Sequence, residues 1–318
     1  MTYYINLLII IFHQFTKEMF RIVIGEKSPK SVAKIIPSKK YVNIVGIQKN
    51  LSRYSNKDFN IISDKDYDDY ERKIASKQGV TIEPPLKYGS KLISDLAPVS
   101  TNLILNTGSI VPVIRPGREV LYIVGASGAG KSYYAMMYLK QYHKQYPSRK
   151  IYLFTDCKQD PLFDDSDLPI TRVALDDTYL ESIEDGEAFI ADDFEDSIVL
   201  FDDTDTIKNK TINKHVYELM RQIMETGRKT NVTCIITSHT MSNRERTRLQ
   251  LSESTSVTFF PSNHFDEHIR YYLSHKMFLN KITIDRIMNL PSSRGARWVT
   301  CVSGRPSYIF YSGGLFII

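Results

Sequence analysis

The chain has 318 residues, of which 42% are hydrophobic, enough to build one large domain or two ordinary ones around a core. Its three cysteines are widely spaced and show no metal-ligand rhythm, which favours free thiols in a reducing compartment. The net charge of +5 is unevenly distributed, because residues 156–205 hold 18 acidic and 2 basic side chains, whereas residues 206–318 hold 7 and 16. Basic segments around an acidic block suit a polynucleotide partner, and solvated surfaces of mixed charge explain each block equally well.

The N-terminus shows no targeting or membrane signal. Its apolar run, residues 7–12, is far shorter than the roughly 20 residues that a membrane-spanning helix needs. It also lacks the basic leader and small-residue cleavage site of a secretory signal, so we expect neither membrane anchoring nor secretion. Met19 opens a more ordinary beginning, and the residues before it are either a buried element or the product of a misassigned start.

The first 95 residues are predicted to form a basic N-terminal region. Residues 27–57 contain eight basic residues and no acidic one, in short β-type runs separated by Ser-Pro and Pro-Ser. This composition indicates a small β-containing, hairpin-like unit, which either is simply exposed or contacts nucleic acid through Tyr41 and Tyr54. A charged helix over 64–77 and a linker follow, so we place the domain boundary near residue 95, with a second domain over 96–318.

From residue 96 the pattern alternates as it does in an α/β domain. Five main strands are predicted, at residues 120–124, 150–155, 198–201, 232–237 and 256–260. A further short strand is expected within the acidic stretch 160–196. Helices are predicted at residues 133–142, 213–227, 264–278 and 282–290. Two final strands, 298–302 and 308–311, are expected to close as a C-terminal hairpin.

The segment GASGAGKS after the first of these strands matches GxxxxGK[ST] in full and stands between a strand and a helix. Its glycines allow successive N–H groups to face a triphosphate, and the start of the helix adds the positive end of its dipole. Lys131 is expected to contact the β- and γ-phosphates, and the Ser132 hydroxyl to bind Mg²⁺. The predicted ATP-binding residues are Gly125, Ala126, Ser127, Gly128, Ala129, Gly130, Lys131 and Ser132.

The segment IVLFDD, residues 198–203, supplies the acidic half of the predicted site. A carboxylate at the end of an apolar strand can lie beside the phosphate loop, and we assign Asp202 to hold Mg²⁺ through water. Asp203 is then placed to orient or deprotonate the attacking water. A strand that merely meets an acidic turn is the alternative, and the position after a complete phosphate loop favours the functional interpretation. Asp205 is expected to cap a helix or to be solvated.

The fourth main strand ends in Thr-Ser-His, where ATPases with an extra strand between the two phosphate-site strands carry a γ-phosphate sensor. Ser238 is the first candidate for this role, and Thr237 and His239 come close behind. A polar strand end that enters a loop explains the same residues equally well.

Arginines on either side of this strand are candidate arginine fingers. Arg228 precedes the strand, and Arg244, Arg246 and Arg248 follow it. Each could stabilise transition-state charge in a neighbouring subunit. For any one of them an ordinary surface position is the competing explanation.

With GASGAGKS, LFDD, TGRKTNVTCIITSH and VTFFP in place, the region from about Val120 to Phe260 resembles the poxvirus-type DNA-packaging ATPases of large DNA viruses, in the FtsK–HerA group of P-loop NTPases. The resemblance implies an α/β fold with a RecA-like parallel sheet of order 5-1-4-3-2, a small N-terminal extension and C-terminal helices or a hairpin. It matches Gly227-Arg228 to the Gly-Arg that precedes the sensor strand. Lys229 stands where a His is often found, and Ser238-His239 where a Gln is common.

The resemblance also implies a function. The expected activity is ATP hydrolysis with Mg²⁺, coupled to sequence-independent packaging or translocation of double-stranded DNA. The expected working form is a homo-oligomeric ring, with viral capsid proteins as candidate partners and the host cytoplasm (viral factory) or the virion as its location. No DxxG follows the acidic strand, which disfavours a GTPase. A nucleoside or nucleotide kinase and a nucleotide-gated, non-enzymatic DNA-binding scaffold remain alternatives.

Overall fold

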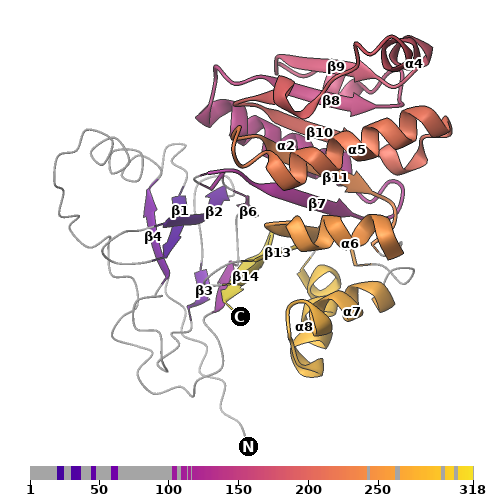
Figure 1. Cartoon of the computed structure of the whole chain (residues 1–318). Coiled ribbons are helices and arrows are strands. Elements are labelled where there is room, and N and C mark those ends of the chain that lie inside the picture. The colour runs from indigo at the N-terminus through magenta and orange to yellow at the C-terminus, as the bar shows by residue number, and fades with distance from the viewer. Residues whose placement is uncertain are drawn as a thin grey trace, which may run out of the picture. The chain divides into compact units, whose positions relative to one another are not determined.

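The computed structural model describes residues 20–24, 30–36, 44–47, 59–63, 102–105, 109–112, 114–115 and 117–317, except 242–243, 262–265, 295–297 and 304–306. Contacts divide the chain into two compact units, drawn in Figure 1: Met1–Val113 with Gly304–Ile318, and Ile114–Ser303. The boundary expected near residue 95 and the helix expected over 64–77 lie outside the described residues. The division into 1–95 and 96–318 therefore stays a prediction.

The secondary structure described within the first unit consists of antiparallel strands. One set runs in the order β4 (Phe59–Ser63), β1 (Phe20–Ile24), β2 (Lys30–Ile36) and β6 (Ser109–Val111). The other runs in the order β3 (Ile44–Ile47), β5 (Asn102–Leu105), β15 (Gly314–Ile317) and β14 (Tyr308–Tyr311). Among these described strands β2 pairs with β1 and β6, and β3 pairs with β5, so the strands within 27–57 do not pair with each other as a hairpin over that range would require.

The second unit is organised around a parallel sheet. Its strands run in the order β12 (Ser256–Phe259), β7 (Val120–Val124), β11 (Thr233–Ser238), β10 (Ile198–Asp202), β8 (Ile151–Thr155) and β9 (Ile170–Ala174). Every residue of β7, β8, β10 and β11 is buried, as in sheets covered on both faces. Numbered along the chain without the edge strand β9, the strands have the order 5-1-4-3-2. β13 (Val299–Val302) pairs antiparallel with β12.

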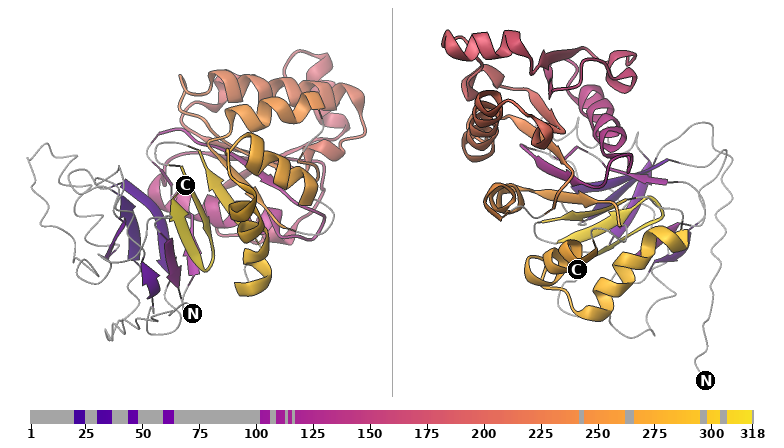
Figure 2. Two further views of the ribbon diagram at one scale, coloured as in Figure 1. Left: turned by 90° about the horizontal axis from the view of Figure 1, so that it is seen from below. Right: turned by 90° about the vertical axis from the view of Figure 1, so that its right-hand side faces the viewer.

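Helices cover both faces of this sheet. Figure 2 shows α2 (Lys131–Gln145) on one side of the strands, and α5 (Lys210–Thr226) and α6 (Arg244–Glu253) on the other. The connections from β7 to β8 and from β10 to β11 run in opposite directions along the sheet. Because such crossovers are right-handed, their helices must lie on opposite faces. This doubly covered arrangement leaves the carboxyl edge of the strands open to a ligand.

Most elements expected from the sequence are present, including α7 (Asp266–His275), α8 (Lys281–Arg294) and both C-terminal strands, β13 and β14. One element that the sequence did not predict is α6 (Arg244–Glu253), whose segment RERTRLQLSE has no periodic apolar stripe to reveal it. The acidic stretch contributes β9, α3 (Pro161–Asp164) and α4 (Asp177–Glu184). Within the described residues, no helix is both long and apolar enough to cross a membrane.

Candidate nucleotide-binding site

The phosphate loop joins β7 to α2 at the carboxyl edge of the sheet, and its glycines serve two purposes. Gly128 and Gly130 have φ angles of 73° and 107°, in the left-handed region that glycine adopts without strain. Gly125 has an ordinary φ but no room, because a Cβ there would lie 2.9 Å from Cδ2 of Phe260. The loop shape predicted from GASGAGKS is therefore present, and α2 starts at Lys131.

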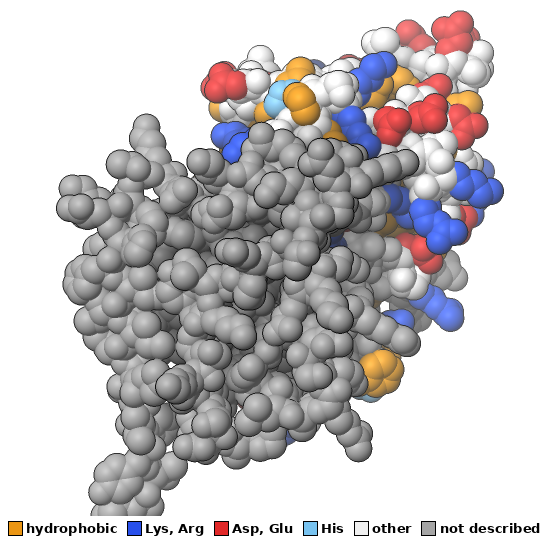
Figure 3. Space-filling model, turned by 90° about the vertical axis from the view of Figure 1, so that its left-hand side faces the viewer, with side chains coloured by type: hydrophobic (Ala, Val, Ile, Leu, Met, Phe, Trp, Pro, Cys, Tyr) orange, Lys and Arg blue, Asp and Glu red, His pale blue; other side chains and the backbone are white. Residues whose placement is uncertain are grey.

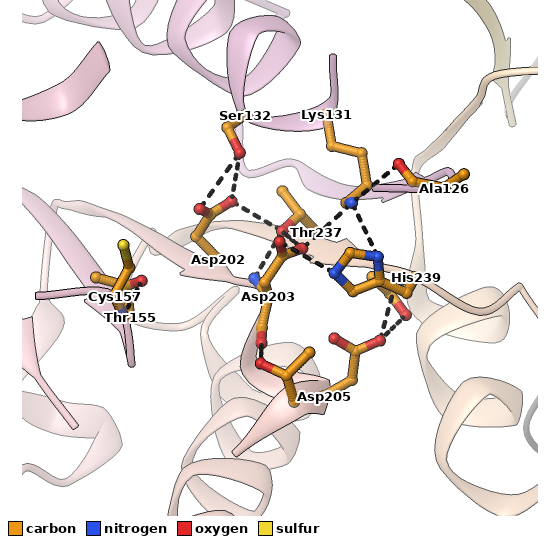
Figure 4. Close-up of polar contacts among 12 residues, drawn as sticks. Ala126, Lys131, Ser132, Thr155, Cys157, Asp202, Asp203, Asp205, Thr237 and His239 are labelled. Atoms are coloured by element: carbon orange, nitrogen blue, oxygen red, sulfur yellow. Dashed lines mark hydrogen bonds and ion pairs between the residues drawn. The ribbon is translucent and has the colours of Figure 1, made fainter. Parts of the chain in front are cut away.

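Lys131 points into the site, and its side chain is only 4% exposed. Its Nζ lies 3.4 Å from Oδ1 of Asp203, 3.3 Å from Nδ1 of His239 and 3.4 Å from the carbonyl oxygen of Ala126 (Figure 4). Three acceptors match the three donors of an ammonium group, but all three contacts are long. The ammonium is therefore held in place by contacts that a phosphate oxygen can replace.

Ser132 and Asp202 face each other across the sheet edge. The Ser132 hydroxyl lies 3.3 Å from both carboxylate oxygens of Asp202, whose side chain is buried. Burial raises the pKa of Asp202 to about 6, against the hydrogen bond from Thr237, and the nearby charge of Asp203 adds to the rise. A buried carboxylate beside a hydroxyl is a set of hard oxygen ligands, and a divalent cation would supply the positive charge that this carboxylate lacks. These residues fit Mg²⁺.

Asp203 follows β10 in an unusual backbone conformation, with φ 49° and ψ 32°. The left-handed region is sparsely populated by residues other than glycine, and such conformations cluster at functional sites. Oδ2 of Asp203 lies 3.1 Å from Nε2 of His239, and its backbone N–H donates to Oγ1 of Thr237 at 2.8 Å. The structure thus brings the predicted base and Lys131 together.

Ser238 lies in the same strand end but has different partners. Its hydroxyl lies within donating distance of Oδ2 of Asp205 (2.9 Å) and of the carbonyl oxygen of Thr240 (3.0 Å). Asp205 is exposed, and it also accepts the backbone N–H of His239 at 2.8 Å, so it holds the turn after β11. The sensor role of Ser238 stays a prediction. Thr237 and His239 lie nearer the acid pair, by which we mean Asp202 and Asp203. Their closeness to these carboxylates is set by the register of β11 against β10.

Of the candidate arginine fingers, Arg228 lies apart from this site, and the side chains of two others are not described. Arg228 is exposed and follows α5, at the amino edge of β11, whereas the phosphate loop lies at the carboxyl edge. A strand of this length spans roughly 17 Å at the usual rise per residue, so Arg228 does not serve its own phosphate loop. Arg248 is exposed on α6, and the side chains of Arg244 and Arg246 are not described. Action in a neighbouring subunit stays a prediction for all four.

Comparisons with known proteins place the chain in a family. No family model matches the sequence. Over 215 residues the chain is 37% identical to the uncharacterized protein V3 of Sputnik virophage, a match that covers 67% of this chain and 82% of that protein.

Solved structures share a more distant likeness. The genome packaging NTPase B204 of Sulfolobus turreted icosahedral virus 2, in complex with AMPPCP, is 10% identical with a TM-score of 0.37, over 58% of this chain and 91% of that chain. The pCW3 conjugation coupling protein TcpA is 12% identical with a TM-score of 0.43, over 91% of this chain and 86% of that chain. Likenesses of this size do not assign an activity. By its identity to V3, the chain belongs to the same family as that virophage protein.

Proposed function

We propose that this protein is an ATP-hydrolysing motor that packages or translocates double-stranded DNA of a large DNA virus. The observation that carries the proposal is the meeting of Lys131, Ser132, Asp202 and Asp203 at the carboxyl edge of one parallel sheet. The choice of double-stranded DNA as the substrate rests on the resemblance of the surrounding motifs to viral packaging ATPases. The family relative in a virophage fits a viral setting, with the viral factory in the host cytoplasm or the virion as the place of action.

The chemistry follows from the positions of the side chains. Lys131 leaves its long contacts and binds the β- and γ-phosphates, and the backbone N–H groups of the phosphate loop cradle the same charge. Ser132 and Asp202 would hold Mg²⁺, which would supply positive charge to the phosphates. Asp203, released from Lys131, orients the attacking water and accepts its proton. ATP binding thus separates an ion pair that otherwise occupies the base.

Surface charge suggests where the DNA lies. Most acidic residues of the segment 156–196 are exposed, and red side chains are seen along the upper margin of Figure 3, at the height of α4 and β9. This end repels a phosphate backbone. We place the DNA against basic side chains of residues 27–57 and 206–318, through phosphate contacts that do not read the sequence. A homo-oligomeric ring and capsid proteins complete the proposed assembly, and sedimentation with ATP and DNA tests the ring.

The proposal is tested by measuring ATP hydrolysis with and without duplex DNA of unrelated sequences, over a range of salt. Each duplex should stimulate hydrolysis, and affinity should fall by about one log unit per log unit of salt for each phosphate neutralised. Charge reversal at Lys34, Lys39 and Lys40 asks whether the N-terminal region contributes to this binding.

Two results would replace the proposal. Phosphoryl transfer to a nucleoside or nucleotide without any effect of DNA would favour a kinase. Nucleotide binding with salt-sensitive DNA binding and no turnover would favour a nucleotide-gated scaffold.

A further inference from the structure

A threonine hydroxyl lies between the two carboxylates of the acid pair. Oγ1 of Thr237 lies 2.8 Å from Oδ1 of Asp202 and 3.2 Å from Oδ1 of Asp203, and it accepts the backbone N–H of Asp203 at 2.8 Å. The Thr237 side chain is 1% exposed, so water does not compete for these positions. One side chain on β11 therefore contacts both acids at the end of β10.

The hydroxyl can satisfy only part of this set at one time. It has a single proton, so it donates to one carboxylate, and the shorter distance assigns that proton to Asp202. A lone pair is left for the backbone N–H of Asp203. Because Thr237 is β-branched, its χ1 angle is restricted, and the hydroxyl oxygen therefore keeps its position. The arrangement ties the backbone of Asp203 to a fixed point in the sheet.

That tie matters because Asp203 is in the left-handed region, where an amino acid other than glycine needs support from its surroundings. The conformation sends the carboxylate toward the phosphate loop, with Oδ1 3.4 Å from Nζ of Lys131 and Oδ2 3.1 Å from Nε2 of His239. With the amide released, the backbone could relax and the carboxylate would turn away from the loop.

We propose that Thr237 is a positioning residue for hydrolysis: its hydroxyl holds Asp203 in the conformation that aims the base at the phosphate loop. The inference rests on the proposed ATP hydrolysis and assigns no contact between Thr237 and the nucleotide. It separates Thr237 from Ser238, whose hydroxyl belongs to the turn fixed by Asp205.

The test compares Thr237→Val, which keeps the shape and removes the hydroxyl, with Thr237→Ser, which keeps the hydroxyl. Thr237→Val should lower kcat by about 10- to 100-fold, the range expected for a hydrogen-bonded group serving a charged residue. Its affinity for mant-ATP should stay within about twofold of wild type, because the phosphate loop is untouched. Thr237→Ser should restore most of kcat.

Thr258→Val is the matched control, because Thr258 is also buried in a parallel strand of the sheet and its hydroxyl pairs with Oγ1 of Thr300 at 2.8 Å. It should leave kcat unchanged. In an Asp203→Asn background at saturating Mg²⁺, Thr237→Val should cause no further loss of kcat, since its bond to Asp202 bears on Mg²⁺ affinity and its bond to the Asp203 N–H bears on the base. If Thr237→Val does not fold, Thr237→Ala takes its place in both comparisons.

Three outcomes would overturn the inference: wild-type kcat in Thr237→Val, an equal loss in Thr237→Ser, or a full additional loss in the Asp203→Asn background. Failure of the proposed function gives a different result: the wild-type protein binds mant-ATP but hydrolyses no ATP. The Thr237 variants then have no kcat to compare with that of wild type.

Discussion

The two edges of the parallel sheet use buried charge in opposite ways. At the amino edge, Glu119 is 3% exposed and accepts hydrogen bonds from the backbone and side chain of Arg115 and from the hydroxyl of Tyr138. Burial, followed by the charge of Glu119, raises the pKa of Tyr138 well above its usual range, so this hydroxyl stays protonated. The carboxylate of Glu119 thus has hydrogen-bond donors from Arg115 and Tyr138 in place.

Arg118 belongs to the same edge and has equally complete contacts. Its guanidinium donates to the carbonyl oxygen of Met224 at 2.7 Å and to that of Val232 at 2.9 Å, so it caps the end of α5. At the carboxyl edge, by contrast, Lys131 has contacts of 3.3–3.4 Å. Charges with close partners hold the fold together, whereas charges with long, replaceable partners are available to a substrate.

The largest expected effect comes from removing the ammonium of Lys131, the charge that is available to a substrate. Lys131→Ala should weaken triphosphate binding by about 100-fold or more, because a charge-assisted contact to the phosphates is lost. The thermal unfolding midpoint should change little, since the contacts of this ammonium are long. Nucleotide titration and a melting curve measure the two quantities. A strongly lowered midpoint would show that Lys131 belongs with the structural charges.

Removing the structural charge should give the reverse pattern. Glu119→Ala leaves Arg115 and Tyr138 without their shared acceptor, and breaking a buried pair in this way costs about 3 kcal/mol of folding free energy. Urea unfolding measures this loss. Nucleotide affinity of the folded variant should remain near that of wild type. Unchanged stability would contradict the contrast between the two edges.

The sequence predicts the phosphate site better than its surroundings, for physical reasons. A phosphate loop is local, so GASGAGKS and the acid pair after an apolar strand can be recognised from consecutive residues. The bridging position of Thr237 depends on the register of β10 against β11, which no spacing in the chain determines. The pairing of β2 with β6 joins segments more than 70 residues apart, and α6 lacks an apolar stripe. These features become visible only in three dimensions.

The smallest expected effect is a difference in thiol reactivity between the two edges of the sheet. Cys157 is exposed just beyond β8 at the carboxyl edge, whereas Cys234 is buried near the amino edge, and burial raises its pKa to about 12. Cys301 is buried as well, and burial also raises its pKa. A thiol reagent should therefore modify one cysteine quickly in the native protein and three in denaturant. Rapid reaction of all three would show that the sheet edge opens.

Asp203→Asn tests the central claim most directly. Asn adopts the left-handed region about as readily as Asp, so the variant keeps the backbone at φ 49° and removes only the charge of the base. The measurement is Mg²⁺-dependent ATP hydrolysis beside mant-ATP affinity, for wild type and variant. We predict wild-type affinity with turnover lowered by about 100-fold or more. Turnover at the wild-type rate would contradict the assignment of Asp203 as the base.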